Sequence, residues 1–474
     1  MIPIELYYAA PYMAAFLLAG LIPVAATLQY RITRAVAPDT RLMALMGVIA
    51  LGALLTVALT PRSLDERDVA AVGKRLASDF EDGFAASRYL TLFVVGAGFV
   101  EMLRGWINSR KAALSDPARP VWIGIVTFYF GTIAIQALVS EHPDFSYKSL
   151  YVPIVLLAVY YQRVTHLQRV LEVAKAAVLG LMLASLAAMF IKPDFVMLRP
   201  AGSVIPGIDF RLFGLSPHAN ALGPVALIGL LLELYSPSAW RVVRAVQLVA
   251  CLAVLVLAQS KTAWVAAVLI MVLVAVPLGL MPAAAMRHPE RRFGRAVFTL
   301  LACIGLMVVA CIGLAIIDSF GNLDRAVQVD TLTGRTMIWS ITLQAWQENL
   351  LFGYGREIWG AERMMQLGLL HVGQAHNQFV QTLGEAGLVG LVLLLTFLLT
   401  LLYASLRCFV ASRGITFALL IVVLARCVTE APLRSDGVLS WPSFTIVLLV
   451  MLACHFLRAG RAGRSGRSEQ SHAR

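Results

Sequence analysis

The stretch AVQLVACLAVLVLAQSKTAWVAAVLIMVLVAVPLGL, residues 245–280, decides the fold class. It contains a single charged side chain, Lys261, in 36 residues. A helix that crosses a bilayer needs about 20 mainly apolar residues. The stretch therefore predicts two membrane spans, 245–258 and 262–280, with Gln259-Ser260-Lys261 as the tight turn between them.

The whole chain has the same apolar character. Of its 474 residues, 59% are hydrophobic and 14% are charged, with a mean hydropathy of +0.79, which excludes an ordinary soluble domain and a disordered chain. The net charge of +12 lies between apolar runs and forms no basic stripe with aromatic residues, so we expect no nucleic-acid partner. The six cysteines lie in or beside apolar segments and are interpreted as small buried side chains.

The fold class predicted from this pattern is all-α, a polytopic integral membrane protein with 12–13 transmembrane helices. The count is twelve if the short segment 245–258, which is joined closely to the segment 262–280, is not a separate span. The candidate spans are 6–28, 42–60, 89–107, 121–139, 149–161, 170–191, 219–235, 245–258, 262–280, 296–317, 386–406, 414–430 and 438–457.

The distribution of Lys and Arg predicts which loops lie on which side. Every second connection, together with the C-terminal tail, holds 21 Lys and Arg residues, whereas the alternate short connections hold six. Basic loops stay on the cytoplasmic side. We expect residues 1–317 to form transmembrane helices with two outer loops, 61–88 and 192–217. Residues 318–385 are predicted to form a large outer subdomain with surface helices. Residues 386–457 are predicted to form the C-terminal transmembrane helices, and residues 458–474 a basic cytoplasmic tail.

The outer subdomain has a helical pattern of its own. Thr333 is a candidate N-cap for a helix that begins near Gly334 and carries Ile338, Ile341, Ala345 and Trp346 on one face. The glycine-containing run 349–355 is expected to end it. Such a helix is typical of a segment that lies on a membrane surface.

Polar residues gather in three blocks on the predicted outer side. They are Phe210-Arg211-Leu212-Phe213-Gly214-Leu215-Ser216-Pro217-His218-Ala219-Asn220, then Gly334-Arg335-Thr336-Met337-Ile338-Trp339, and last His376-Asn377-Gln378-Phe379-Val380-Gln381-Thr382-Leu383-Gly384-Glu385-Ala386-Gly387. In these blocks, and in their order, the sequence resembles the O-antigen ligase and O-antigen polymerase superfamily, which includes bacterial protein O-oligosaccharyltransferases. The chain departs from many members at Lys261, where they have Arg, and Lys lacks the bidentate fork.

The resemblance implies a glycosyltransferase of the bacterial inner membrane, with its active site facing the periplasm and its C-terminus in the cytoplasm. It would move a glycan from undecaprenyl diphosphate to an acceptor hydroxyl, with inversion and with no metal or other cofactor. Arg211 and Arg335 suit stabilisation of a diphosphate leaving group, and His376 suits a general base. These three are the candidate catalytic residues, and the candidate substrate-binding residues are Lys261, Arg199, His371, His218 and Asn377.

Several other polar and charged residues are interpreted as structural. Glu66 and Asp68 have the spacing of a metal-binding pair, but such pairs arise by chance in a loop with six acids. Arg426, Glu430 and Arg434 are spaced to form an ion-pair ladder on one helix face. Asn377 and Glu385 are expected to shape the start of the following span.

Several functions remain open. Within the superfamily the favoured activity is the ligase, with a lipid A-core sugar as acceptor and membrane lipids around both substrates. The polymerase and the protein glycosylating enzyme share the donor and differ in the acceptor. A lipid or solute transporter would show two related halves with ionisable residues near mid-membrane, and no internal repeat is visible. A scaffold would leave the outer Arg and His blocks dispensable.

Overall fold

The computed structural model describes residues 36–60, 62, 64, 85–109, 115–199, 205, 208–280, 299, 330–367, 372–435 and 437–472. Two of the predicted spans, 6–28 and 296–317, lie outside these residues. The other eleven predicted spans each coincide with a helix. Seven of the described helices are long and apolar enough to cross a membrane, and the prediction of an all-α polytopic membrane protein is confirmed.

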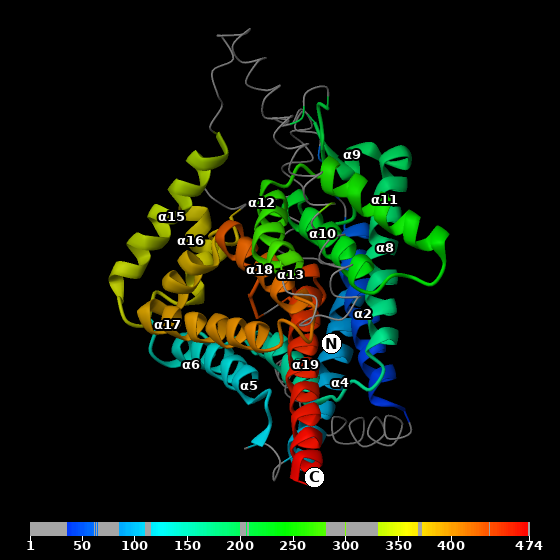
Figure 1. Ribbon diagram of the computed structural model, residues 1–474. Helices are drawn as coiled ribbons and strands as arrows, with labels where there is room; N and C mark the ends of the chain where they lie inside the picture. The colour runs from blue at the N-terminus through cyan, green and yellow to red at the C-terminus, as the bar shows by residue number, and fades with distance from the viewer. Residues whose placement is uncertain are drawn as a thin grey trace, which may run out of the picture.

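The described helices are coloured in chain order in Figure 1. They are α2 (Pro38–Ala58), α4 (Ala85–Ser109), α5 (Arg119–Ile125), η2 (Val126–Phe130), α6 (Gly131–Leu138), η3 (Tyr147–Leu150), α7 (Tyr151–Tyr161), α8 (Leu167–Ile191), α9 (Pro193–Val196), α10 (Ala219–Tyr235), α11 (Arg241–Leu257), α12 (Lys261–Ile270), η4 (Met271–Ala275), α13 (Val276–Leu280), α15 (Asp330–Glu348), η6 (Arg356–Trp359), α16 (Ala361–Gln366), α17 (Gln378–Arg407), α18 (Ile415–Thr429) and α19 (Trp441–His472). The segments η2 and η4 are π-helical and continue the helices on either side of them.

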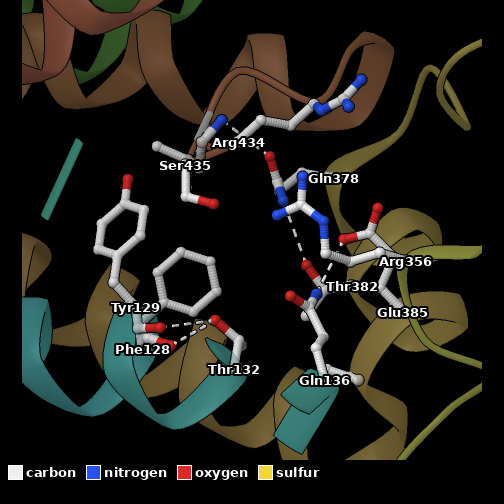
Figure 2. A pocket seen from close by; sticks show the side chains of 12 residues that line it. Phe128, Tyr129, Thr132, Gln136, Arg356, Gln378, Thr382, Glu385, Arg434 and Ser435 are labelled. Carbon is white, nitrogen blue, oxygen red and sulfur yellow. Dashed lines mark hydrogen bonds between the residues drawn. The ribbon is translucent and has the colours of Figure 1, made fainter. Parts of the chain in front are cut away.

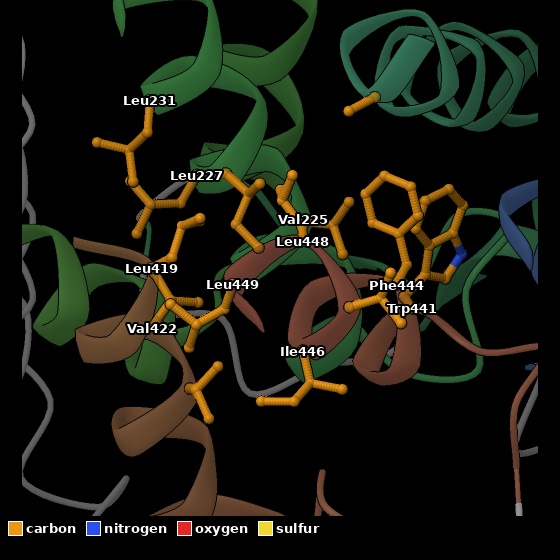
Figure 3. Close-up of a cluster of buried hydrophobic side chains, with 14 of the residues drawn as sticks. Val225, Leu227, Leu231, Leu419, Val422, Trp441, Phe444, Ile446, Leu448 and Leu449 are labelled. Atoms are coloured by element: carbon orange, nitrogen blue, oxygen red, sulfur yellow. The ribbon is translucent and has the colours of Figure 1, made fainter. Parts of the chain in front are cut away.

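The core lies where α10, α18 and α19 meet. Nearly every side chain of α10 is buried, as expected for a helix that is apolar all round. Figure 3 shows Leu227 and Leu231 of α10 near Leu419 of α18, with Leu448 of α19 beside them. These helices therefore form the centre of the bundle.

The helix α4 lies at the periphery and packs mainly on α7. Its large apolar side chains Tyr89, Phe93, Trp106 and Ile107 are exposed. A contiguous apolar surface of this kind is costly in water, but it is the normal outer surface of a protein in lipid. The exposed face of α4 is thus consistent with a membrane-spanning helix.

Side chains at the ends of the helices tie different spans together. Thr262 of α12 bonds Thr429 of α18, with 2.9 Å between the hydroxyl oxygens. Arg458 bonds Asp116 at 2.7 Å, and Arg413 donates to the carbonyl of Tyr235 at 2.9 Å. The membrane side of each loop stays a prediction of the charge count.

The helix α17 is broken at Gly387, where φ is 63°. The loop after α15 inserts there, because the Leu388 N–H donates to the carbonyl of Leu350 while the Gly384 carbonyl accepts from the Tyr354 N–H. In an unbroken helix Leu388 and Gly384 would bond each other. The break divides α17 into a short first segment, which carries the residues after His376, and a long second segment that matches the predicted span 386–406.

The surface helix α15 differs at its start from the prediction. It begins at Asp330 and not near Gly334, so Thr333 lies inside the first turn and is not the N-cap. Arg335 consequently lies in the second turn of the helix and does not open it. The predicted break at 349–355 is confirmed, with Gly353 and Gly355 both at positive φ.

The outer segment before α10 is held to the bundle by a two-stranded antiparallel ladder and by one arginine. The strands are β1 (Met197–Leu198) and β2 (Arg211–Leu212), with Leu198 opposite Arg211. The guanidinium of Arg62 donates to the carbonyls of Phe195 at 2.8 Å, Ser216 at 2.7 Å and Gly214. Arg62 thereby fixes the backbone between Arg211 and α10.

Candidate active site

Glu430 lies at the centre of the site, directly after the last residue of α18, and its side chain is 12% exposed. Its Oε2 lies 2.8 Å from Nδ1 of His376 and 3.3 Å from Nε2 of Gln374. Its Oε1 accepts from Nδ2 of Asn220 at 3.3 Å and lies 3.6 Å from Nη2 of Arg335. One carboxylate therefore joins residues from the starts of α10 and α17 and from α15.

The turn that carries His376 is braced on both sides. His376 has a φ of 48°, a left-handed conformation that is uncommon for a residue other than glycine. The Ala375 N–H donates to Oε1 of Gln381 at 2.6 Å, and the Ala375 carbonyl accepts from Nε1 of Trp339 at 2.8 Å. Asn377 caps α17, because its side chain accepts hydrogen bonds from the N–H groups of Phe379 and Val380. Such strain persists where the surroundings hold it, and it concentrates at functional sites.

Arg211 is connected to the same carboxylate through Asn220. Its Nη2 donates to Oδ1 of Asn220 at 3.3 Å and to the carbonyl of Gln259 at 3.4 Å, and its buried Nε has no hydrogen-bond partner among the described residues. Burial, together with the positive charge of Arg335, lowers the pKa of Arg211. Arg335 lies beside the carboxylate and Arg211 reaches it only through Asn220, so the two guanidinium groups are not neutralised by one carboxylate and can bind a further anion.

The ionisation of Glu430 follows from its partners. Burial raises the pKa of its carboxyl, but the hydrogen bond from His376, the electrostatic effect of the imidazoles of His376 and His218, and the hydrogen bond from Asn220 together outweigh burial. The net pKa is below its ordinary value, so the carboxylate is charged at neutral pH. A charged carboxylate accepts the proton on Nδ1 of His376, and in the neutral ring Nε2 is then a hydrogen-bond acceptor.

His218 is the second imidazole of the site. Part of the ring is exposed, yet the protein packed around it lowers its pKa to about 4 by desolvation. Glu430 opposes this shift, whereas the charges of Arg211, His376 and Arg335 add to it. His218 is therefore neutral at neutral pH, and its Nδ1 accepts the N–H of Asn220 at 3.1 Å as the N-cap of α10.

The remaining predicted site residues fall in different places. Lys261 is exposed as the first residue of α12, between Gln259 and the Thr262–Thr429 contact, and so lies at the edge of the site. Arg199 is exposed and packs over the ring of Phe210 at 5.5 Å, away from the residues that contact Glu430. His371 lies outside the described residues.

Sequence reasoning missed Glu430. The ladder predicted for Arg426, Glu430 and Arg434 is wrong, because α18 ends at Thr429 and Glu430 is extended, with φ −151°. Arg434 instead donates to the carbonyl of Gly373 at 2.8 Å. Pro432 could have indicated the end of the helix, because helices usually end at or before the residue that precedes a proline.

Within the part of the chain that the structure describes, no three His, Cys, Asp or Glu side chains are grouped so that they could hold a metal ion. Glu430, the central carboxylate, is occupied by His376, Asn220 and Arg335. Glu66 and Asp68 lie outside the described residues. The site is thus a cationic and imidazole site around one carboxylate.

Comparison with known proteins adds a similarity to one family. Residues 225–395, 171 of the 474 residues, match the family model described as O-antigen ligase. The matched range contains Lys261, Arg335 and His376 but ends before Glu430. No curated protein matches the chain.

The similarity indicates a general kind of activity. Proteins of this family are membrane glycosyltransferase-like enzymes of the O-antigen ligase and polymerase type, which act in lipopolysaccharide biosynthesis. Their partners are in general a polysaccharide-lipid donor and a lipid acceptor. This chain is a multi-pass membrane protein that is similar to the family over residues 225–395.

Proposed function

We propose that the protein is an O-antigen ligase. It transfers O-antigen polysaccharide from undecaprenyl diphosphate to a sugar hydroxyl of lipid A-core, at the periplasmic face of the inner membrane, with inversion and without a metal. The observation that carries the proposal is the hydrogen bond from His376 to Glu430, placed beside Arg211 and Arg335. This combination supplies a base and an anion site within one small cluster.

His376 is proposed as the general base. With its Nδ1 proton on Glu430, its Nε2 can take the proton of the acceptor hydroxyl as that oxygen attacks the anomeric carbon. The bond from the anomeric carbon to the diphosphate oxygen breaks in the same step, and the electron pair leaves with the diphosphate. A single displacement of this kind inverts the anomeric configuration.

Arg211 and Arg335 are proposed to bind the diphosphate. The leaving group gains negative charge in the transition state, and preorganised guanidinium groups stabilise that charge best where water is partly excluded. The unpaired Nε of Arg211 offers a donor that the described protein does not use. Lys261 lies close enough to the site edge to contribute a further positive charge.

The activity is tested with a deletion strain complemented by wild type or by His376→Ala. For a ligase, the deletion and the His376→Ala strain both carry bare lipid A-core on a lipopolysaccharide gel, while lipid-linked polymer accumulates. Core with a single repeat unit would instead assign a polymerase. An unchanged ladder would contradict both and favour protein glycosylation or transport.

The metal-independent mechanism has its own test. The purified protein is assayed after dialysis against EDTA, and we expect the transfer rate to stay unchanged. A rate that falls and is restored by Mg²⁺ or Mn²⁺ would contradict the proposal and direct attention to Glu66 and Asp68.

A further inference from the structure

The turn that follows α15 carries two leucines at its tip. The side-chain Oδ1 of Asn349 accepts from the Phe352 N–H at 3.1 Å, and the Asn349 carbonyl accepts from the Gly353 N–H at 2.7 Å. These bonds close a tight turn whose two central residues are Leu350 and Leu351, which are 49% and 55% exposed. In water the centre of a turn usually holds Gly, Pro, Asn, Asp or Ser. Two exposed leucines at this position therefore indicate surroundings other than water.

The end of α6 adds two more apolar residues beside this turn. Nδ2 of Asn349 donates to the carbonyl of Val139 at 3.3 Å, and the Glu141 N–H donates to the carbonyl of Gly353 at 3.0 Å. Leu138, the last residue of α6, is 74% exposed, and Val139 is exposed as well. We call Leu138, Val139, Leu350 and Leu351 the apolar patch. Its four members come from two segments that are distant in the sequence.

The apolar patch continues the exposed face of the span in α17. The Leu350 carbonyl accepts from the Leu388 N–H at 3.0 Å, and the Leu351 carbonyl accepts from the Val389 N–H at 3.1 Å. Figure 1 shows α15 ending next to the start of α17, with α6 beside it. The exposed apolar residues of α17 recur at every third or fourth position on one helix face: Leu388, Val392, Leu395 and Leu399. A face of this kind on a membrane-spanning helix contacts lipid.

The position of the apolar patch along the spans places it at the edge of the bilayer core. Leu138 ends the candidate membrane span Arg119–Leu138, and Leu388 lies near the start of the predicted span 386–406. Trp346 is partly exposed beside the patch, and its Nε1 donates to the Leu350 carbonyl at 2.9 Å. Tryptophan is enriched where the hydrocarbon meets the lipid headgroups. The patch thus lies at the depth where the acyl chains begin.

Polar contacts fix the segments that carry the apolar patch. Figure 2 shows Gln136, Arg356 and Glu385 around a small cavity. Nε2 of Gln136 donates to Glu385 at 3.2 Å, which ties the end of α6 to the first segment of α17. Arg356, which follows the turn, donates to the hydroxyl of Ser149. The patch is therefore presented by segments that are held in place, and its leucines stay outside the bundle.

The exposed side chains of α15 itself are of a mixed kind. They are Met337 and Leu343 together with the polar Gln344, Gln347 and Glu348, among others. Long polar side chains keep their ends in water or among the lipid headgroups while their stems cover apolar surface. The helix is therefore suited to lie on the membrane surface, whereas the turn at its end is suited to enter the membrane.

We propose that the apolar patch inserts into the acyl-chain region of the bilayer and anchors the end of α15 in the membrane. Its partner is lipid, because the patch is continuous with the exposed face of α17 and lies level with the ends of two spans. The helix α15 also carries Arg335, whose Nη2 lies 3.6 Å from Oε1 of Glu430. The anchor therefore fixes the depth of Arg335 relative to the bilayer. This insertion involves no substrate, so it does not depend on the proposed glycosyl transfer.

The test places an environment-sensitive fluorophore, an NBD group, on Leu351→Cys in the full-length protein. The protein is reconstituted in vesicles of phosphatidylethanolamine and phosphatidylglycerol, with or without a nitroxide on the acyl chains. Glu357→Cys is the matched control, because Glu357 is charged and exposed in η6. Wild type treated with the same label gives the background from the six native cysteines. We expect nitroxide lipids to quench the label at 351 about twofold more than the label at 357, and aqueous iodide to quench only the label at 357.

A second labelled variant, Leu138→Cys, decides the question if the label at 351 disturbs the turn, because Leu138 belongs to the patch but not to the turn. Quenching of the patch label by iodide and not by nitroxide lipids would show that the patch faces water. A patch label that neither agent quenches would show that protein, such as a second copy of the chain, covers the patch. Either result would overturn the proposed insertion, and neither would bear on the proposed glycosyl transfer.

Discussion

Glu430 lies 2.8 Å from Nδ1 of His376, although the two residues are 54 positions apart in the sequence. The carboxylate sets which ring nitrogen carries the proton and holds the ring in one orientation, as the carboxylate of a serine-protease triad does for its histidine. The backbone of His376, with its strained φ, and the hydrogen bonds to Ala375 also hold the imidazole in position. The site is thus organised around the position of one imidazole.

The first prediction concerns that carboxylate. Glu430→Gln keeps the shape of the side chain and removes its charge, so the tautomer of His376 is no longer enforced. We expect kcat to fall by about 10²- to 10⁴-fold, the usual contribution of a positioned general base. The measurement is glycan transfer by purified protein, with membrane insertion checked by protein level.

Glu357→Gln is the matched control for this change. Glu357 is an exposed carboxylate in η6, in the part of the chain between Arg335 and His376. Its amide variant should transfer glycan at the wild-type rate. If Glu430→Gln were also fully active, the assignment of His376 as an oriented base would be wrong.

The second prediction tests whether Arg211 and Arg335 act through specific contacts with the diphosphate and not through positive charge in general. Arg211→Ala and Arg335→Ala should each lower the rate by about 10²- to 10³-fold, as the loss of one preorganised donor to a developing anion does. Arg211→Lys keeps the charge without the fork and should recover only part of the rate. Lys148→Ala removes an exposed cation from the same end and should leave the rate unchanged. Equal effects at all three positions would argue against a diphosphate site.

The third prediction concerns stability against pH. The pKa of His218 is about 4 in the folded protein against an ordinary value of 6.5. Between these values the unfolded chain binds a proton that the folded protein does not, so the free energy of unfolding falls as the pH falls. Glu430 contributes slope only at the acid end of this window, because its lowered pKa acts below its ordinary value of 4.5.

His218→Asn removes the imidazole and keeps an N-cap acceptor for α10. The thermal midpoint of the wild type should therefore fall more steeply than that of His218→Asn between pH 6.5 and pH 4. Parallel curves would show that His218 keeps its ordinary pKa. In the activity profile, an acid limb centred near pH 4 would contradict the assignment of His376 and point to His218 as the base.

The spans were predictable because hydropathy reports the surroundings of a whole segment. The apolar runs at 219–235 and 386–406 each coincide with a helix, although their local environments differ. The break at Gly387 was not predictable, because it depends on Leu350 and Tyr354 approaching from another part of the chain. A hydropathy profile does not report contacts between residues that are distant in the sequence.

The site was predictable as far as residue type and membrane side could reveal it. His376 and Arg211 stand out as polar groups next to apolar spans. Glu430 does not, because its role depends on the end of α18 and on where His376 lies in space. The same reason explains the missed Arg62, whose partners are backbone carbonyls and leave no trace in the sequence pattern.

The fourth prediction concerns Arg62 as a positioning residue. Arg62→Lys keeps one charge but cannot reach the carbonyls of Phe195, Gly214 and Ser216 together. We expect a higher KM for the donor, because Arg211 follows the movement of this segment, and faster tryptic cleavage at Arg211. Wild-type kinetics with an unchanged cleavage rate would show that the ladder of β1 and β2 holds the segment without Arg62.

The fifth prediction concerns the break in α17. A Cβ on Gly387 would lie 2.3 Å from the Leu351 carbonyl oxygen and 2.5 Å from the Phe352 nitrogen, and its φ of 63° strains any L residue. With a ψ of −163°, Gly387 lies in a backbone region that is essentially confined to glycine, where another residue costs about 1–3 kcal/mol. Gly387→Ala should lower the thermal midpoint by several degrees and reduce activity, whereas Gly180→Ala in α8, with nothing within 4 Å, should not. A midpoint unchanged in Gly387→Ala would mean that the loop can leave α17 without cost.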